Sequence, residues 1–224
     1  MRLVRIRFSK TDTAKYMSHL DLNRLMQRLI KKSRLPVWYT EGFNPHAYVT
    51  FALPLPLGHE GLNESMDIRI EGPTGNEAIK ERLTAVLPPG LAIKTVYDTQ
   101  DAPKTIAFAL YEINLLLEPG QDAETLAKEF NSLVKNTELK AKKMGKKGKR
   151  KIEKEIILNP LIESFEAKAL DGKVQITATL AAGSKANLNP DLLLTSLQEA
   201  SGAQIELAKI VRKDILKADF EPFE

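Results

Sequence analysis

Several residue types that commonly carry chemistry are missing or scarce in this chain of 224 residues. It has no cysteine, which excludes disulfides, thiolate metal sites and an iron–sulfur cluster held by the chain itself. It also lacks any run of about 18 apolar residues, so the sequence predicts no membrane span. No apolar segment follows the N-terminal basic residues, as one would in a signal peptide. These features together predict a cytoplasmic protein.

Histidine is scarce too: His19, His46 and His59 are the only three, and all lie within 41 residues. Neutral imidazoles with a carboxylate such as Asp21 or Glu60 suit zinc or iron. However, none of the short histidine spacings typical of such sites occurs, and neither a Walker loop nor a dinucleotide-binding glycine pattern is present. The sequence therefore predicts no metal and no cofactor, and leaves His46 as a weak candidate for a catalytic acid or base.

Basic charge is concentrated in two segments. Residues 1–34 contain ten Lys/Arg and two Asp, and residues 140–151 contain eight Lys/Arg and no acid, so each segment is net +8. Because the whole chain is only +4, the remaining residues together carry −12. This segregation predicts a polyanionic partner such as RNA. The alternative for 140–151 is a solvated loop that only keeps the protein soluble.

Hydrophobic periodicity over the first half predicts alternating strands and helices. Residues 3–8 alternate apolar and basic, which indicates a half-buried strand. Residues 18–34 fit an amphipathic helix capped by Ser18, with one apolar stripe and one basic stripe. The other elements expected are strands at 37–40, 47–55 and 65–71, a helix at 76–88 capped by Asn76, and a strand at 91–98.

The second half repeats this order after a polar, proline-containing segment at 98–105. The elements expected are a strand at 106–118, a helix at 122–136, strands within 137–143, 152–170 and 173–182, a helix at 189–202 capped by Asn189 with Pro190 in its first position, and a strand at 203–216. The sequence thus predicts an α+β protein of two tandem ferredoxin-like (split βαβ) sandwiches, with domains at 1–99 and 105–224. A flexible basic loop at 140–151 belongs to the second domain.

The stretch "YTEGFNPHAYVTFALPLPLG", residues 39–58, has the composition of a binding loop. Gly42 can adopt a positive φ, and Asn44 before Pro45 is restricted to extended geometry. Together they predict a stiff turn that directs Phe43 and His46. The alternative is an ordinary hairpin turn with Phe43 packed inward.

Cationic side chains follow phosphates, and aromatic rings stack on unpaired bases. The aromatic content of 6% and the lack of the usual RNA-recognition-motif sequence exclude an ordinary domain of that class. The cationic and aromatic candidates for an RNA-binding surface are Arg5, Arg7, Arg24, Arg28, Lys31, Lys32, Tyr39, Phe43, Tyr48, Lys146, Lys147, Lys149 and Arg150.

The block "YMSHLDLNRLMQRLIKKSRLPVWYTEGFNPHAYVTFALPLPLG" and the later "ESMDIRIE", with Glu64 and Asp67, closely resemble the signature of the radical-SAM-linked protein family. That signature consists of SHLDL, a basic helix, LP, a GFNP loop, a proline-rich apolar run and an acidic strand. The segments "LPPGLAI" and "RKIEKEIILNPLI" also resemble family features, so the likeness extends over about residues 1–215. His46-Ala47 departs from the family, which commonly has a second proline there.

Members of this family are domains of unknown function, found alone or at the C-terminus of proteins with a cobalamin-binding-like region and a radical-SAM domain. The radical-SAM domain holds its cluster with three cysteines, so the resemblance implies that this chain is a stand-alone form and that radical chemistry comes from a separate protein. The family supplies no settled catalytic residues. The resemblance implies a functional surface formed by Ser18, His19, Asp21, Arg24, Arg28, Gly42, Phe43, Asn44 and Pro45.

Three functional hypotheses follow. The first is a non-catalytic RNA-binding or substrate-presenting module that works with a radical-SAM enzyme in tRNA or rRNA modification. The second is a protein-interaction adaptor whose basic helix docks on an acidic partner without RNA. The third, by analogy of architecture, is a metal-independent endoribonuclease that uses His46. We expect the first.

Overall fold

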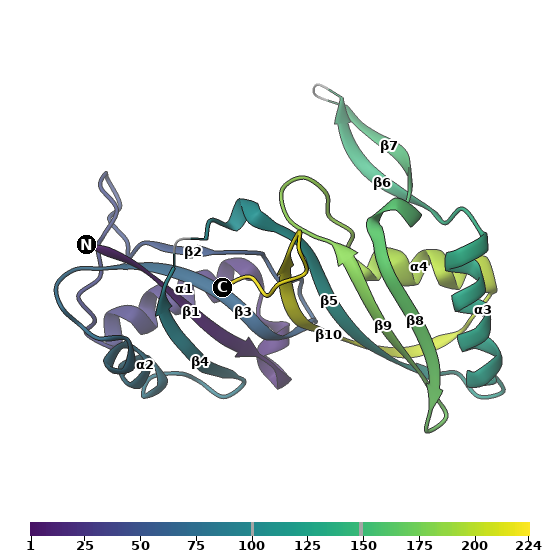
Figure 1. Ribbon diagram of the computed structural model, residues 1–224, viewed down its shortest axis with the longest axis horizontal. Coiled ribbons are helices and arrows are strands. Elements are labelled where there is room, and N and C mark those ends of the chain that lie inside the picture. The colour runs from purple at the N-terminus through teal and green to yellow at the C-terminus, as the bar shows by residue number, and fades with distance from the viewer. Residues whose placement is uncertain (100, 148–149) are drawn as a thin grey trace. The chain divides into compact units, whose positions relative to one another are not determined.

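The computed structural model describes residues 1–99, 101–147 and 150–224 and is a mixed α+β structure (Figure 1). It divides into two compact units: unit 1 is Met1–Ile106 with Val211–Glu224, and unit 2 is Ala107–Ile210. The first junction lies just after the predicted linker. Unit 2 differs from the predicted second domain because residues 211–224 belong to unit 1. Among the described residues, no helix is both long and apolar enough to cross a membrane.

Unit 1 is built on a sheet in which β1 lies between β3 and β4 and pairs antiparallel with both. On the other edge of β3, β2 pairs antiparallel, and β10 pairs parallel through Val211 and Arg212. The elements are β1 (Arg2–Lys10), α1 (His19–Lys32), β2 (Val49–Phe51), β3 (Glu60–Ile70), α2 (Asn76–Thr84), β4 (Leu91–Asp98) and β10 (Ile205–Lys217), of which residues 211–217 lie in this unit.

Helix α1 forms as its sequence predicts. The Ser18 hydroxyl accepts a hydrogen bond from the Asp21 backbone N–H at 3.2 Å, which satisfies one of the unpaired donors of the first turn. The same hydroxyl donates to the Asp21 carboxylate at 2.6 Å. The predicted apolar stripe is buried, because Leu22, Met26, Leu29 and Ile30 all lie in the core.

One face of the unit 1 sheet packs against both helices. Alternate residues of the central strands, including Val4 and Ile6 of β1 and Met66 and Ile68 of β3, are fully buried with the apolar faces of α1 and α2. Polar residues of the same strands therefore face the opposite side of the sheet.

Three local predictions for this unit need correction. Gly75, not Asn76, is the N-cap of α2, because the Asn76 side-chain oxygen instead accepts a hydrogen bond from Arg2 at 2.9 Å. The strand expected at 37–40 is reduced to isolated bridges, and the one expected at 47–55 is shortened to β2. The prolines that follow cannot donate ladder hydrogen bonds, which ends the strand early.

Unit 2 consists of strands with helices packed on them. The strand order is β10-β5-β9-β8, with β9 antiparallel to both neighbours. Alternate residues of β5 are buried, and Phe130 of α3 and Leu193 of α4 join this core. The predicted cap of α4 by Asn189, with Pro190 in the first position, is confirmed. The elements are β5 (Ile106–Leu117), α3 (Ala123–Asn136), β8 (Ile162–Leu170), β9 (Lys173–Ala181) and α4 (Pro190–Ser201).

The basic segment 140–151 is not the predicted loop. Most of it forms an antiparallel hairpin of β6 (Lys140–Lys147) and β7 (Arg150–Ile157), which is a separate two-stranded sheet (Figure 1). An opposite charge across the strands favours this pairing, because Lys140 of β6 lies 3.5 Å from the Glu155 carboxylate of β7. Lys140 also lies 3.2 Å from the carboxylate of Glu138, which precedes β6. The hydrogen bond that the Lys140 ammonium donates to the Glu138 carboxylate is the main reason that the pKa of Lys140 is raised.

The core of unit 1 gives a direct test of this fold. Met26→Ala removes a fully buried side chain of α1 and is expected to lower the free energy of unfolding by about 2–5 kcal/mol. Leu20→Ala on the same helix removes a side chain that is 67% exposed, so its effect is expected to stay within about 0.5 kcal/mol. Urea unfolding of both variants measures the difference, and equal destabilisation would contradict the assigned helix orientation.

Candidate functional site

A groove in unit 1 brings the basic stripe of α1 together with the loop that follows this helix. Its volume is about 460 Å³, which is enough for a nucleotide-sized ligand. The lining residues are Arg24, Gln27, Arg28 and Lys31 of α1, and Tyr39, Pro45, His46 and Ala47 of the loop.

The three cations of the groove share one exposed helix face. Arg24, Arg28 and Lys31 follow one another at helical spacing, so their side chains lie on adjacent turns. The Arg28 Nε donates to the Arg24 backbone oxygen at 3.3 Å, and an Arg24 Nη lies 3.7 Å from the Asp21 carboxylate. Because the ion pair with Asp21 is long and exposed, it holds Arg24 only weakly and leaves it able to bind an anion.

The loop opposite is closed by hydrogen bonds at its base. The Thr40 N–H donates to the His46 backbone oxygen at 2.9 Å, and the His46 N–H donates to the Thr40 hydroxyl at 3.2 Å. Gly42 has a φ of 126°, a backbone conformation in which any residue with a side chain would be strained. These features support the predicted stiff turn, which Figure 1 shows as a narrow hairpin leading into β2.

The imidazole of His46 is oriented by the loop backbone. Its Nδ1 lies 3.0 Å from the carbonyl oxygen of Asn44 and 3.1 Å from the Thr40 hydroxyl. A carbonyl oxygen can only accept, so Nδ1 carries the proton. In the neutral ring Nε2 then has a lone pair, and in the charged ring it becomes a donor. Either form can bind a polar ligand group in the groove.

Phe43 lies at the tip of this loop, and its side chain is fully exposed. The alternative interpretation, in which Phe43 packs inward as part of an ordinary turn, is therefore wrong. Tyr39, at the base of the same loop and in the groove lining, is 42% exposed. Tyr48 instead packs under the Arg69 guanidinium, 4.5 Å from its ring centre.

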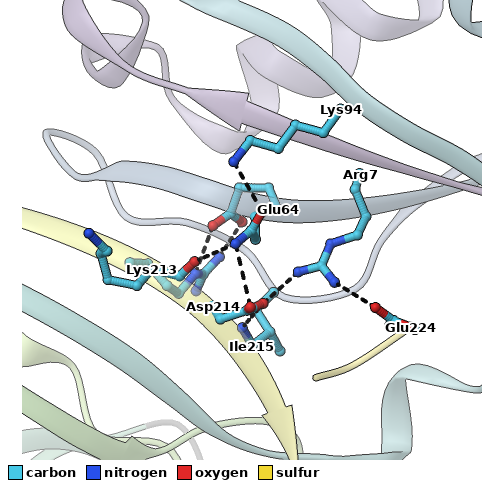
Figure 2. A network of polar contacts seen from close by, with 9 residues as sticks. Arg7, Glu64, Lys94, Lys213, Asp214, Ile215 and Glu224 are labelled. Carbon is cyan, nitrogen blue, oxygen red and sulfur yellow. Dashed lines mark hydrogen bonds and ion pairs between the residues drawn. The ribbon is translucent and has the colours of Figure 1, made fainter. Parts of the chain in front are cut away.

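Arg5 and Arg7 do not belong to this basic surface. Both are buried on the sheet face away from the helices. The Arg5 guanidinium forms a bidentate salt bridge with the Asp67 carboxylate, in which Nε and Nη2 donate at 2.7 and 2.9 Å. It also stacks on Phe223, 3.9 Å from the ring centre. Arg7 pairs with Asp214 and lies 3.7 Å from the Glu224 carboxylate (Figure 2). The strand predicted to be half-buried is in fact buried on both faces.

A second buried pair attaches β10 to this sheet. The Arg212 Nε donates to the Glu64 carboxylate at 2.9 Å, and its Nη groups donate to the carbonyl oxygens of Leu53 and Pro54. Nearby, the Asn63 amide donates to the Lys213 carbonyl at 2.9 Å. The acidic pair of "ESMDIRIE" is thus a structural element, with Glu64 on Arg212 and Asp67 on Arg5.

The other predicted site residues lie at varied places. His19 is half-buried against Phe51, with ring centres 5.1 Å apart, and its pKa is lowered by burial and by the nearby Lys10 charge. Lys32 is exposed on α1 but does not line the groove. Of the segment 140–151, Lys147 lies opposite Arg150 and Lys146 precedes it in β6, whereas Lys149 lies outside the described residues.

Two lining residues, Gln27 and Ala47, were missing from the predicted set. Gln27 could have been found from its position between the helical neighbours Arg24 and Lys31. The three histidines do not assemble with acids into a metal-ligand group anywhere in the part of the chain that the structure describes.

The chain is thus a mixed α+β protein with a cationic groove between α1 and the loop that follows it. A family model described as "Uncharacterized protein conserved in bacteria (DUF2344)" matches residues 3–190, so the chain belongs to that family. No curated protein matches the chain.

Similarity to solved structures concerns the fold alone. A chain in the crystal structure of a Cbf5-Nop10-Gar1 complex aligns with a TM-score of 0.51 and 9% identity, covering 95% of this chain and 48% of that one. The present chain thus spans about half the length of that chain. An unknown protein from Galdieria sulphuraria aligns over 94% of this chain and 98% of its own, at 14% identity, but its TM-score is only 0.26.

The division of the arginines into buried and surface groups is testable. Arg5→Gln leaves Asp67 buried without its charged partner, so we expect the free energy of unfolding to fall by about 3–5 kcal/mol. Arg28→Gln changes an exposed side chain and should alter it by no more than about 0.5 kcal/mol. Thermal or urea unfolding of both variants measures these changes. An Arg5→Gln variant as stable as the wild-type chain would contradict a structural role for Arg5.

Proposed function

We propose that the chain is a non-catalytic RNA-binding module and that the groove between α1 and its loop is the binding site. The observation that carries this proposal is the convergence of Arg24, Arg28 and Lys31 with His46 around one cleft. Guanidinium and ammonium groups bind phosphate oxygens and release counterions from a polyanion. The cleft therefore suits a phosphodiester backbone.

The neutral groups of the groove favour RNA as the polyanion. The His46 Nε2 and the Gln27 amide can each donate or accept a hydrogen bond, as recognition of a ribose 2′-hydroxyl requires. The lining residues that the structure describes include one histidine and no carboxylate. Such a lining supports recognition better than cleavage, which usually needs a matched acid and base.

The arrangement of strands supports the finer fold proposal of two ferredoxin-like sandwiches. In unit 1, β4-β1-β3-β2 follows the split βαβ order, with α1 and α2 as the connections. In unit 2, β10-β5-β9-β8 repeats that order, and the β6–β7 hairpin is an insertion between α3 and β8. This hairpin carries the second basic segment and is proposed to make additional phosphate contacts.

We further infer that the module acts in the cytoplasm with a radical-SAM protein in tRNA or rRNA modification. The support is the sequence resemblance of the "SHLDL" and "GFNP" segments to the radical-SAM-linked family. Under this proposal the chain holds the RNA, and the partner supplies the chemistry. Affinity purification of the tagged chain, with and without nuclease, tests the partnership: recovery of a radical-SAM protein supports it, and its absence from both samples rejects it.

Two neighbouring lysines test the site itself. Lys31→Ala removes a groove cation, whereas Lys32→Ala removes the same charge from the next residue, outside the lining. We expect Lys31→Ala to weaken binding to total cellular RNA and to lower the slope of log affinity against log salt by about 0.7, the value for one single-strand phosphate contact. Lys32→Ala should change neither measurably.

Filter binding at several salt concentrations provides both quantities. Binding that is absent, or that does not depend on salt, would contradict RNA binding. Equal losses in the two variants would mean that RNA contacts the helix elsewhere than in the groove. A partner protein retained by the wild-type chain after nuclease treatment, without any RNA binding, would favour the adaptor function instead.

A further inference from the structure

We propose, on the basis of the RNA-binding function above, that the groove selects single-stranded RNA, and that Phe43 is the platform on which an unpaired base stacks. Three features support this role of Phe43: the exposure of its ring, the stiffness of its loop and the position of that loop beside the cations.

The exposure of Phe43 has no explanation in the stability of the fold. Its ring is in full contact with solvent, whereas burial of a phenylalanine ring normally contributes favourable free energy. The other phenylalanines of unit 1 are less exposed: Phe8 and Phe223 are buried, Phe51 packs against Phe8 and His19, and Phe220 is 49% exposed. Phe43 is therefore available to contact another molecule.

The loop holds this ring in place before any ligand arrives. Hydrogen bonds between Thr40 and His46 close the base, and Pro45 fixes one further backbone torsion. The bridge between Tyr39 and Ala47 continues the pairing below them. Ordering an aromatic ring on binding costs conformational entropy, and a preformed loop reduces that cost.

The groove and the ring are close along the chain. Pro45 and His46 line the groove, and Phe43 precedes them by two and three residues at the tip of the same closed loop. We infer that a strand whose phosphates contact Arg24, Arg28 and Lys31 continues along this loop from His46 to the exposed ring at its tip. Groove cations bind the backbone of any sequence, whereas stacking requires a base with a free face.

This requirement distinguishes single strands from duplexes. In an A-form duplex the faces of the bases are covered by their neighbours, so Phe43 has nothing to stack on. Only the phosphate contacts then remain. Because stacking is tolerant of base identity, we expect selection for unpaired RNA without strong sequence preference.

Fluorescence anisotropy with a labelled single-stranded RNA of mixed sequence, and with the same strand annealed to its complement, tests the proposal. We expect the wild-type chain to bind the single strand about tenfold more tightly than the duplex, the usual effect of stacking one base. Phe43→Leu keeps an apolar side chain without the ring, and is expected to abolish this difference by weakening single-strand binding alone. Phe43→Tyr should retain it.

Tyr16→Leu is the matched control, because Tyr16 is an exposed aromatic residue (69%) that does not line the groove. It should leave both affinities unchanged. Equal affinities of the wild-type chain for single strand and duplex, or unchanged single-strand affinity in Phe43→Leu, would overturn the stacking proposal while leaving RNA binding intact. Failure to bind either RNA would instead overturn the RNA-binding function on which the proposal rests.

Discussion

The pairing of Arg5 with Asp67 on the central strands of unit 1 is the constraint on which the remaining structure depends. A buried guanidinium without a partner is costly, so Asp67 of β3 must face Arg5 of β1. Residues of β10 and the C-terminal segment complete the arrangement, since Asp214 neutralises Arg7 and Phe223 covers Arg5. Unit 1 is therefore assembled from two segments that are distant in the sequence.

This arrangement separates the basic residues of the first 34 positions into two kinds. Arg5 and Arg7 of the strand form buried salt bridges within unit 1. Arg24, Arg28 and Lys31 remain exposed, because α1 buries only its apolar stripe. The helix amphipathicity thus creates the cationic face, and the stiff loop after it supplies the opposite wall with His46. The groove arises where these two local features meet.

The sequence was sufficient for those features that depend on local patterns. Periodicity located α1 and its cap at Ser18, and glycine and proline indicated the turn that carries Phe43. Predictions from the sequence failed where pairing between residues distant in the chain determines which side chains meet. Alternation alone could not show that Arg5 faces Asp67, 62 residues away, nor that Arg212 returns to Glu64. Strands were expected within 137–143 and 152–170, but a loop was predicted for the basic segment 140–151, because its charge pattern is equally typical of a solvated loop.

The most direct test of the central claim is to map where bound RNA contacts the protein, by photo-cross-linking a single strand that contains 4-thiouridine and identifying the modified peptides by mass spectrometry. We expect cross-links in the loop 39–47 and on the face of α1 that carries Arg24, Arg28 and Lys31, with additional contacts on the β6–β7 hairpin. Cross-links confined to that hairpin, or to the opposite face of the unit 1 sheet near Arg5, would contradict it.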